Sequence, residues 1–149
     1  MFDDRFYNPN KIYIRKNPVL SIYEKKFFHI MRKKLYPNFI ITPQVNLQSI
    51  IETNTYTRNN ELFRNVDFGI FDTEMYNPIL LIEINGKQHN NKGYWIKRDN
   101  SVKEILEKAN IMLYTINNED LKSDKKIEEL ANELLNLTIK IENIYSYKK

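Results

Sequence analysis

Apolar residues recur along the chain in patterns that predict three helices and four strands. Helical spacing predicts helices over residues 21–36, over residues 99–109 and over a long stretch near the C-terminus. Alternating or continuous apolar runs predict strands over residues 39–47, 65–72, 79–85 and 111–116. A meander of three strands followed by a helical crossover predicts an α/β fold, in which helices flank a mixed sheet.

Local signals mark the ends of several of these elements. Ser21-Ile-Tyr-Glu24 fits a capping box at the start of the first helix, and Pro37 is expected to stop that helix. Pro43 indicates that the first strand lies at an edge of the sheet, because proline has no backbone N–H to donate to a neighbouring strand. Asn110 is predicted to cap the second helix in a left-handed conformation.

Length and composition predict one globular domain. The 149 residues are 42% hydrophobic and 28% charged, and we divide them into an arm (residues 1–18, with at most a short strand at 12–14) and a domain (residues 19–149). No apolar run is long enough to span a membrane, and the N-terminus lacks a signal-peptide layout, so we expect a cytoplasmic protein. The absence of cysteine excludes disulfides and thiolate metal sites.

Positive charge is concentrated at the N-terminus. The net charge is +4, but residues 1–36 carry nine Lys and Arg against three carboxylates, whereas 37–116 and 117–149 each sum to −1. A lysine-rich composition gives the net charge little weight by itself. Its distribution nevertheless makes the arm and first helix candidates for contact with nucleic acid.

Asp67 and Glu83 each interrupt an otherwise apolar strand. A short turn joins the two strands, so they are expected to form an antiparallel hairpin. A register that pairs Asp67 with either Glu83 or Asn85 places both acids on one face. Two adjacent carboxylates repel each other unless a cation lies between them, and Mg²⁺ or Mn²⁺ suits oxygen ligands. The alternative is a pair of acids that face water or form salt bridges.

Glu24 has two interpretations. It completes the capping box, and it also lies at the centre of the apolar stripe of the first helix. A buried acid is costly unless it is paired or bound to a metal, so Glu24 is also a candidate third acid of the site. The stripe consists of Leu20, Phe27, Phe28, Met31 and Leu35, and the opposite face carries Lys25, Lys26, His29 and Lys33.

Polar and basic residues follow Glu83. His89 is a candidate to hold a water or a phosphate and Lys87 to offset developing charge, although a loop histidine is often merely solvated. Lys103 can reach the sheet or pair with Asp99. Basic and aromatic residues that suit phosphate contact and base stacking follow in the chain: Lys92, Tyr94, Trp95, Lys97 and Arg98. Trp95 can equally cover the core.

Together these residues resemble the PD-(D/E)XK nuclease superfamily, which has the restriction-endonuclease-like fold. The closest resemblance is to an uncharacterised branch related to very-short-patch-repair endonucleases. That branch pairs a Val-Asp-Phe strand with Glu-x-Asp/Asn-x-x-x-His, followed by Arg-Asp and a helical lysine. This chain reads Val66-Asp67-Phe68, then Glu83-Ile-Asn-Gly-Lys-Gln-His89, Arg98-Asp99 and Lys103, and the similarity spans residues 17–120.

The resemblance implies a metal-dependent DNA endonuclease in a repair, restriction or mobile-element context. It implies Mg²⁺ held by Asp67, Glu83 and the Ile84 carbonyl, with Glu24 close by, and a water activated for attack on phosphate. Asn85 occupies the position of the superfamily's lysine and carries no charge. The lysine's role is therefore expected to pass to Lys87, His89 or Lys103.

Two other functions fit the same sequence. One is a nucleic-acid-binding module that kept the fold and lost the chemistry. The other is an interaction protein that docks through the stripe of the last helix, although that stripe is better suited to covering the sheet. A homodimer or a larger nuclease assembly is compatible with any of these functions. The stripe consists of Ile127, Leu130, Ala131, Leu134, Thr138, Ile141 and Tyr145.

Overall fold

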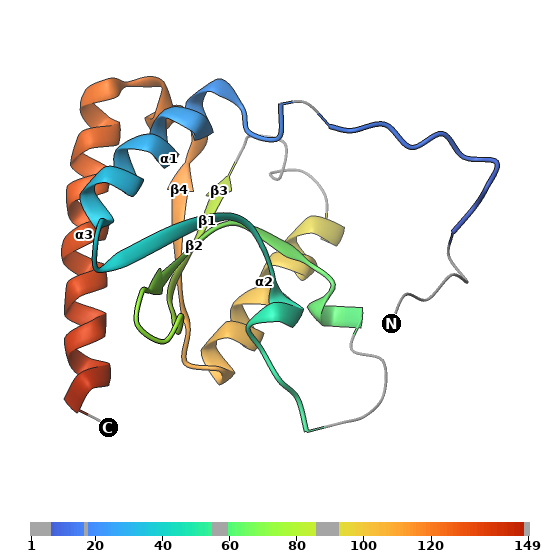
Figure 1. Cartoon of the computed structure of the whole chain (residues 1–149). Helices are drawn as coiled ribbons and strands as arrows, with labels where there is room; N and C mark the ends of the chain where they lie inside the picture. The colour runs from blue at the N-terminus through green and yellow to red at the C-terminus, as the bar shows by residue number, and fades with distance from the viewer. Residues whose placement is uncertain (1–6, 17, 55–59, 86–92, 148–149) are drawn as a thin grey trace.

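The protein folds as a three-layer α/β structure (Figure 1). The computed structural model describes the backbone of residues 7–16, 18–54, 60–85 and 93–147, and the side chains of these residues except 60, 93–100 and 145–147. The sheet has the order β1 (Phe39–Asn46), β2 (Asn65–Asp72), β3 (Pro78–Asn85) and β4 (Met112–Asn117). Helices α1 (Ile22–Leu35) and α3 (Asp124–Tyr147) cover one face, and α2 (Gly93–Lys108) covers the other.

The strand directions follow from the connections. β1, β2 and β3 are antiparallel neighbours, whereas β4 runs parallel to β3 because α2 carries the chain back between them. The expected mixed sheet flanked by helices is therefore confirmed. Short 3-10 helices follow β1 (Leu47–Ser49), precede β2 (Asn60–Leu62) and link β4 to α3 (Asn118–Lys122).

Two hydrophobic cores lie on the two faces of the sheet. The first core is enclosed by α1 and α3, and the second lies under α2 and the 3-10 helices beside β1 and β2. Burial of these apolar side chains is the main favourable term in folding. Fully buried members of the first core include Phe27, Met31, Phe68, Ile70, Leu80, Ile82, Ile127, Ala131 and Leu134. The second contains Val45, Leu47, Leu62, Val66, Leu81 and Leu106.

Strand β2 supplies side chains to both cores. Phe68 and Ile70 belong to the first core, but Val66 packs in the second. Regular alternation along a strand would place all three side chains on one face, so the alternation breaks at Val66. The cause lies in the neighbouring strand, where Gln44 has a φ of 53° and interrupts the β1–β2 pairing beside Asp67. The change of face therefore occurs next to a candidate site residue.

The ends of the helices agree with local sequence signals in all but one case. Ser21 and Glu24 form the expected capping box, and Asn110 has the expected left-handed φ of 57°. Helix α2 begins at Gly93, so the predicted start at residue 99 was wrong. Residues 93–98 read Gly-Tyr-Trp-Ile-Lys-Arg and contain no proline, so nothing in this segment prevents a helix.

The two edges of the sheet differ. β1 is an edge strand, as Pro43 predicted, and the proline lies next to the left-handed Gln44. β4 forms the other edge and has the sequence Met-Leu-Tyr-Thr-Ile-Asn, with neither proline nor charge.

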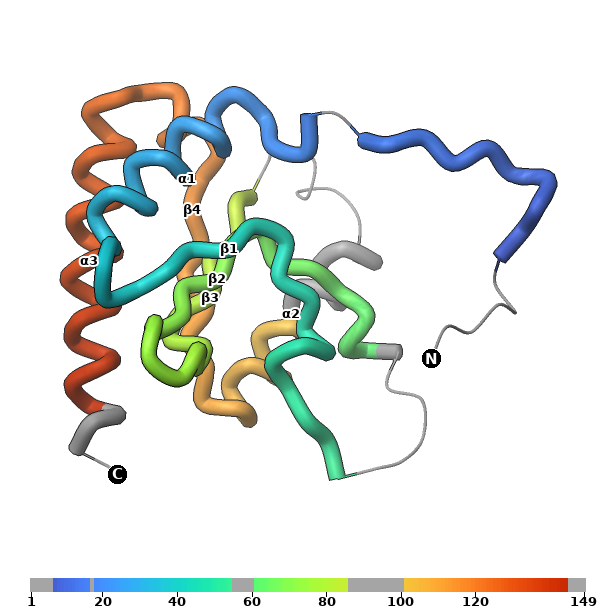
Figure 2. Tube along the Cα trace, in the orientation of Figure 1, coloured from blue at the N-terminus to red at the C-terminus, as the bar shows by residue number. Residues whose placement is uncertain are grey.

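Residues 7–16 form an exposed segment that leads away from the domain (Figures 1 and 2). No strand forms at residues 12–14, where the sequence allowed at most a short one. Across the parts of the chain that the structure describes, no helix has both the length and the apolar character to cross a membrane.

Candidate functional site

Asp67 and Glu83 lie side by side on β2 and β3. The backbone pairing of these strands ends at Phe68 and Ile82, and the two acids are the next residue on each strand. Both side chains are half-buried. Ile82 and Ile84 pack on the first core, so alternation along β3 directs Glu83 toward the opposite face. The two acids therefore hold neighbouring positions on adjacent strands, just past the last backbone pair.

The carboxylate of Asp67 takes the place of a backbone acceptor. Its Oδ2 accepts a hydrogen bond from the Ile84 N–H at 2.7 Å. At this level β3 remains paired with β4, up to Asn85 opposite Asn117, but its backbone pairing with β2 has stopped. Asp67 therefore spans the point at which two strands part, and its orientation is fixed by the main chain of the neighbouring strand.

The first turn of α1 lies at the same end of the sheet. A three-residue connection joins α1 to β1, whose first residue pairs with Asp72, so the C-terminal end of α1 lies at the Asp72 end of β2. Farther back along the helix, the ring of Phe28 stacks on that of Phe68 with 6.0 Å between centroids. The start of α1, including Glu24, must therefore lie toward the Asp67 end.

Glu24 performs the helix-capping role that the sequence predicts. Its Oε1 accepts from the Ser21 N–H and its own N–H donates to the Ser21 Oγ, both at 3.2 Å. Among the side chains that the structure describes, no three His, Asp or Glu residues gather closely enough to hold a metal ion. A role for Glu24 as a metal ligand therefore remains a prediction.

Asn85 and Lys103 are the remaining predicted catalytic residues whose side chains the structure describes. Asn85 is exposed at the end of β3. Lys103 is exposed and lines a hollow of about 450 Å³ beside Met112 and Leu113, at the start of β4. Lys87, His89 and Lys92 lie outside the described residues. The backbone of α2 includes Tyr94, Trp95, Lys97 and Arg98, whose side chains lie outside the described part.

Comparison with known families identifies the domain. Residues 16–136 match the family model described as Protein of unknown function (DUF2726). The chain belongs to the DUF2726 family. The matched region includes all four strands, α1 and α2, and with them Glu24, Asp67 and Glu83. No curated protein and no solved structure matches the chain significantly.

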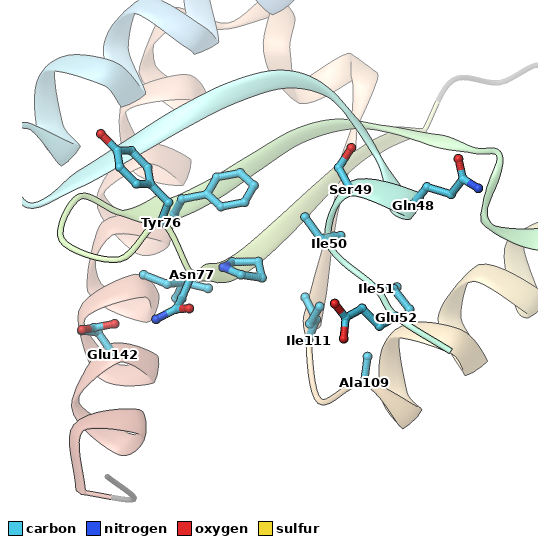
Figure 3. A pocket seen from close by; sticks show the side chains of 13 residues that line it. Gln48, Ser49, Ile50, Ile51, Glu52, Tyr76, Asn77, Ala109, Ile111 and Glu142 are labelled. Carbon is cyan, nitrogen blue, oxygen red and sulfur yellow. The ribbon is translucent and has the colours of Figure 1, made fainter. Parts of the chain in front are cut away.

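The DUF2726 domain also has a groove that the sequence did not predict. It has a volume of about 750 Å³ and is lined by residues from the segment after β1, the β2–β3 turn and α3 (Figure 3). Phe71 and Pro78 line it, so it lies at the opposite end of the β2–β3 hairpin from Asp67 and Glu83. No linear motif marks this groove, because its walls come together only through the tertiary fold.

Among the side chains that the structure describes in the DUF2726 domain, those of Asp72 and Tyr114 have shifted pKa values. The pKa of Asp72 lies below its ordinary value. Burial by itself would raise this pKa, but hydrogen bonds from backbone N–H groups in the β2–β3 turn stabilise the charged carboxylate and outweigh the effect of burial. Two of these donors are Met75 and Asn77, at 2.7 and 3.0 Å. Burial, together with the nearby Glu133 carboxylate, raises the pKa of Tyr114. Neither group belongs to the carboxylate pair.

Proposed function

We propose that the chain is a metal-dependent endonuclease that hydrolyses phosphodiester bonds in DNA, in a repair, restriction or mobile-element context. The observation that carries this proposal is the adjacency of Asp67 and Glu83 where β2 and β3 stop pairing. Two half-buried carboxylates at one point are favourable when a cation neutralises them. A divalent cation beside a scissile phosphate can promote hydrolysis of the phosphodiester by stabilising the charge that develops on it.

The oxygen atoms available beside Asp67 and Glu83 suit a hard divalent metal ion as ligands. Asp67, Glu83 and the main-chain carbonyl of Ile84 supply only oxygen, the ligand type that Mg²⁺ and Mn²⁺ prefer. When bound, the ion would lower the pKa of a water and offset charge on the phosphate. The contribution of the chain is preorganisation, since the Ile84 N–H holds the Asp67 carboxylate in place before substrate arrives.

Other residues complete the proposed site by offsetting charge and positioning nucleic acid. Because Asn85 is uncharged, we assign the orientation of water and the neutralisation of phosphate to Lys87, His89 or Lys103. Glu24, at the same end of the sheet, is proposed to act close to the carboxylate pair. Contacts to the nucleic acid are assigned to Lys92, Tyr94, Trp95, Lys97 and Arg98.

Cleavage of labelled single-stranded and duplex DNA tests the proposal. The wild type is expected to cut in Mg²⁺ or Mn²⁺ and not in EDTA, and Asp67→Asn and Glu83→Gln are expected to lose cutting. Glu74→Gln is the matched control, because Glu74 is an exposed carboxylate in the turn at the other end of the hairpin. Cutting that persists in Asp67→Asn, or that is lost equally in Glu74→Gln, would contradict the assignment.

A second candidate is a nucleic-acid-binding module without chemistry, and the neutral Asn85 favours it. This candidate predicts salt-sensitive DNA binding that survives Asp67→Asn, with no cleavage by the folded wild type. Docking through the α3 stripe has less support, because Ile127, Ala131 and Leu134 are already buried in the first core. A partner would have to use the other side of α3.

A further inference from the structure

The segment Tyr7–Lys16, here called the tyrosine arm, is basic and exposed. Every one of its residues is exposed, and it contains Lys11, Arg15 and Lys16 but no acid. It thus projects three cations into solvent without an internal counter-charge. Such a segment raises the local concentration of polyanions.

Two tyrosines give the arm a defined local structure. The rings of Tyr7 and Tyr13 stack with 5.8 Å between centroids and 21° between planes. Asn8 holds the pair, because its N–H donates to the Tyr13 Oη at 3.1 Å and its carbonyl accepts from that hydroxyl at 3.2 Å. Both rings remain about 60% exposed, at 61% and 62%. The arm therefore presents flat aromatic surface beside its cations.

The arm is attached at the end of the sheet that carries the candidate site. The arm precedes α1 in the chain, and the start of α1 lies toward the Asp67 end of β2, as the contact of Phe28 with Phe68 indicates. In Figure 1 the arm leaves the domain from this end of α1. A strand bound near Asp67 and Glu83 would therefore have the arm within reach.

We propose that the tyrosine arm binds unpaired nucleotides, with bases stacked on Tyr7 and Tyr13 and phosphates contacting Lys11, Arg15 and Lys16. The inference rests on the proposed function for its class of ligand and narrows it to nucleic acid with single-stranded character. A base can stack on a side chain only when it has left its neighbours in a duplex. Interleaved cations and aromatic rings are the features that single strands require.

Two exposed apolar residues of the arm suggest that it binds protein instead of nucleic acid. Ile12 and Ile14 are 86% and 85% exposed, as expected of a segment that docks on protein. That reading accounts for the two isoleucines alone. Nucleic acid accounts for the cations, the stacked rings and the attachment beside the carboxylate pair, so we argue for nucleic acid and let the experiment include self-association.

Fluorescence anisotropy of the full chain with labelled oligothymidylate in EDTA tests the proposal, because EDTA separates binding from cleavage. Tyr13→Ala is expected to weaken binding by about 5- to 150-fold, the usual effect of losing one stacking ring. Tyr13→Phe, which keeps the ring and loses the bond to Asn8, should weaken binding less. Replacing Lys11, Arg15 and Lys16 together by Gln should reduce the slope of log affinity against log salt by about 2.

Controls separate this inference from the proposed function. Tyr76→Ala removes an exposed tyrosine from the β2–β3 turn, and Lys125→Gln removes an exposed cation from α3, and neither should change affinity. Asp67→Asn should keep full binding even if cleavage is lost or never present. Unchanged affinity in Tyr13→Ala and in the triple variant would overturn the inference. So would a dimer in sedimentation analysis that Ile12→Asp dissociates while Tyr13→Ala leaves DNA binding intact.

Discussion

Gly69 is a position at which the addition of a single methyl group should disturb the packing of the sheet close to the candidate site. It lies in β2, two residues from Asp67, and pairs with Thr42 on one side and Leu81 on the other. A Cβ added here would lie 2.9 Å from the Val45 Cγ2, 3.0 Å from the Phe71 Cε2 and 3.2 Å from the Leu81 Cδ2. Carbon atoms in contact normally stay about 3.5–4.0 Å apart.

The expected cost of Gly69→Ala follows from these distances. Three neighbours must move by several tenths of an ångström, and β2 cannot withdraw because β1 and β3 hold both of its sides. Inserting one methyl group into a packed core typically costs about 1–3 kcal/mol. For a chain of this length, that loss lowers the melting temperature by roughly 2–12 °C.

Thermal and urea unfolding followed by circular dichroism measure this loss, and a double-mutant cycle identifies its cause. Val45→Ala removes the closest of the three contacts, so Gly69→Ala should cost less in the Val45→Ala background than in the wild type, by at least about 0.5 kcal/mol. Equal costs in both backgrounds, or a Gly69→Ala protein as stable as the wild type, would refute the packing argument.

Three further substitutions have expected outcomes. Ser21→Ala should lower the unfolding free energy by about 1 kcal/mol in urea titrations, because it removes the α1 cap that Glu24 completes. Asp72 has a lowered pKa in the fold, so its stabilisation is complete above about pH 4 and is lost as pH falls through the folded value. Asp72→Asn should therefore destabilise at pH 7 and flatten the stability profile below pH 4. Asp67→Asn keeps an oxygen acceptor for the Ile84 N–H, so stability should change by less than about 1 kcal/mol while metal-dependent cleavage disappears.

The sequence predicted those elements whose signals are local. The capping box at Ser21, the left-handed Asn110 and the edge position given by Pro43 each depend on a few neighbouring residues, and each is present. The start of α2 was missed because the helical spacing of apolar residues was recognised only from residue 99 onward. The change of face at Val66 was missed because its cause lies in another strand.

The same distinction applies to the candidate site. The positions of Asp67 and Glu83 on neighbouring strands could be predicted because a short hairpin restricts the register to few choices. The hydrogen bond from Ile84 to Asp67 could not be predicted, since it depends on where the β2–β3 backbone pairing stops. The groove beside Phe71 has walls from segments far apart in sequence and left no signal at all.

The two edges of the sheet differ in their ability to pair with an additional strand. At β1, Pro43 lacks a backbone donor and Gln44 turns the chain out of the extended conformation, so an additional strand would find an incomplete ladder there. β4 offers its outer N–H and C=O groups along an uncharged, proline-free strand. A fused domain, a partner strand or an aggregating copy that extends this sheet should therefore attach along β4, and engineered lysines at exposed Met112 or Thr115 would close that route.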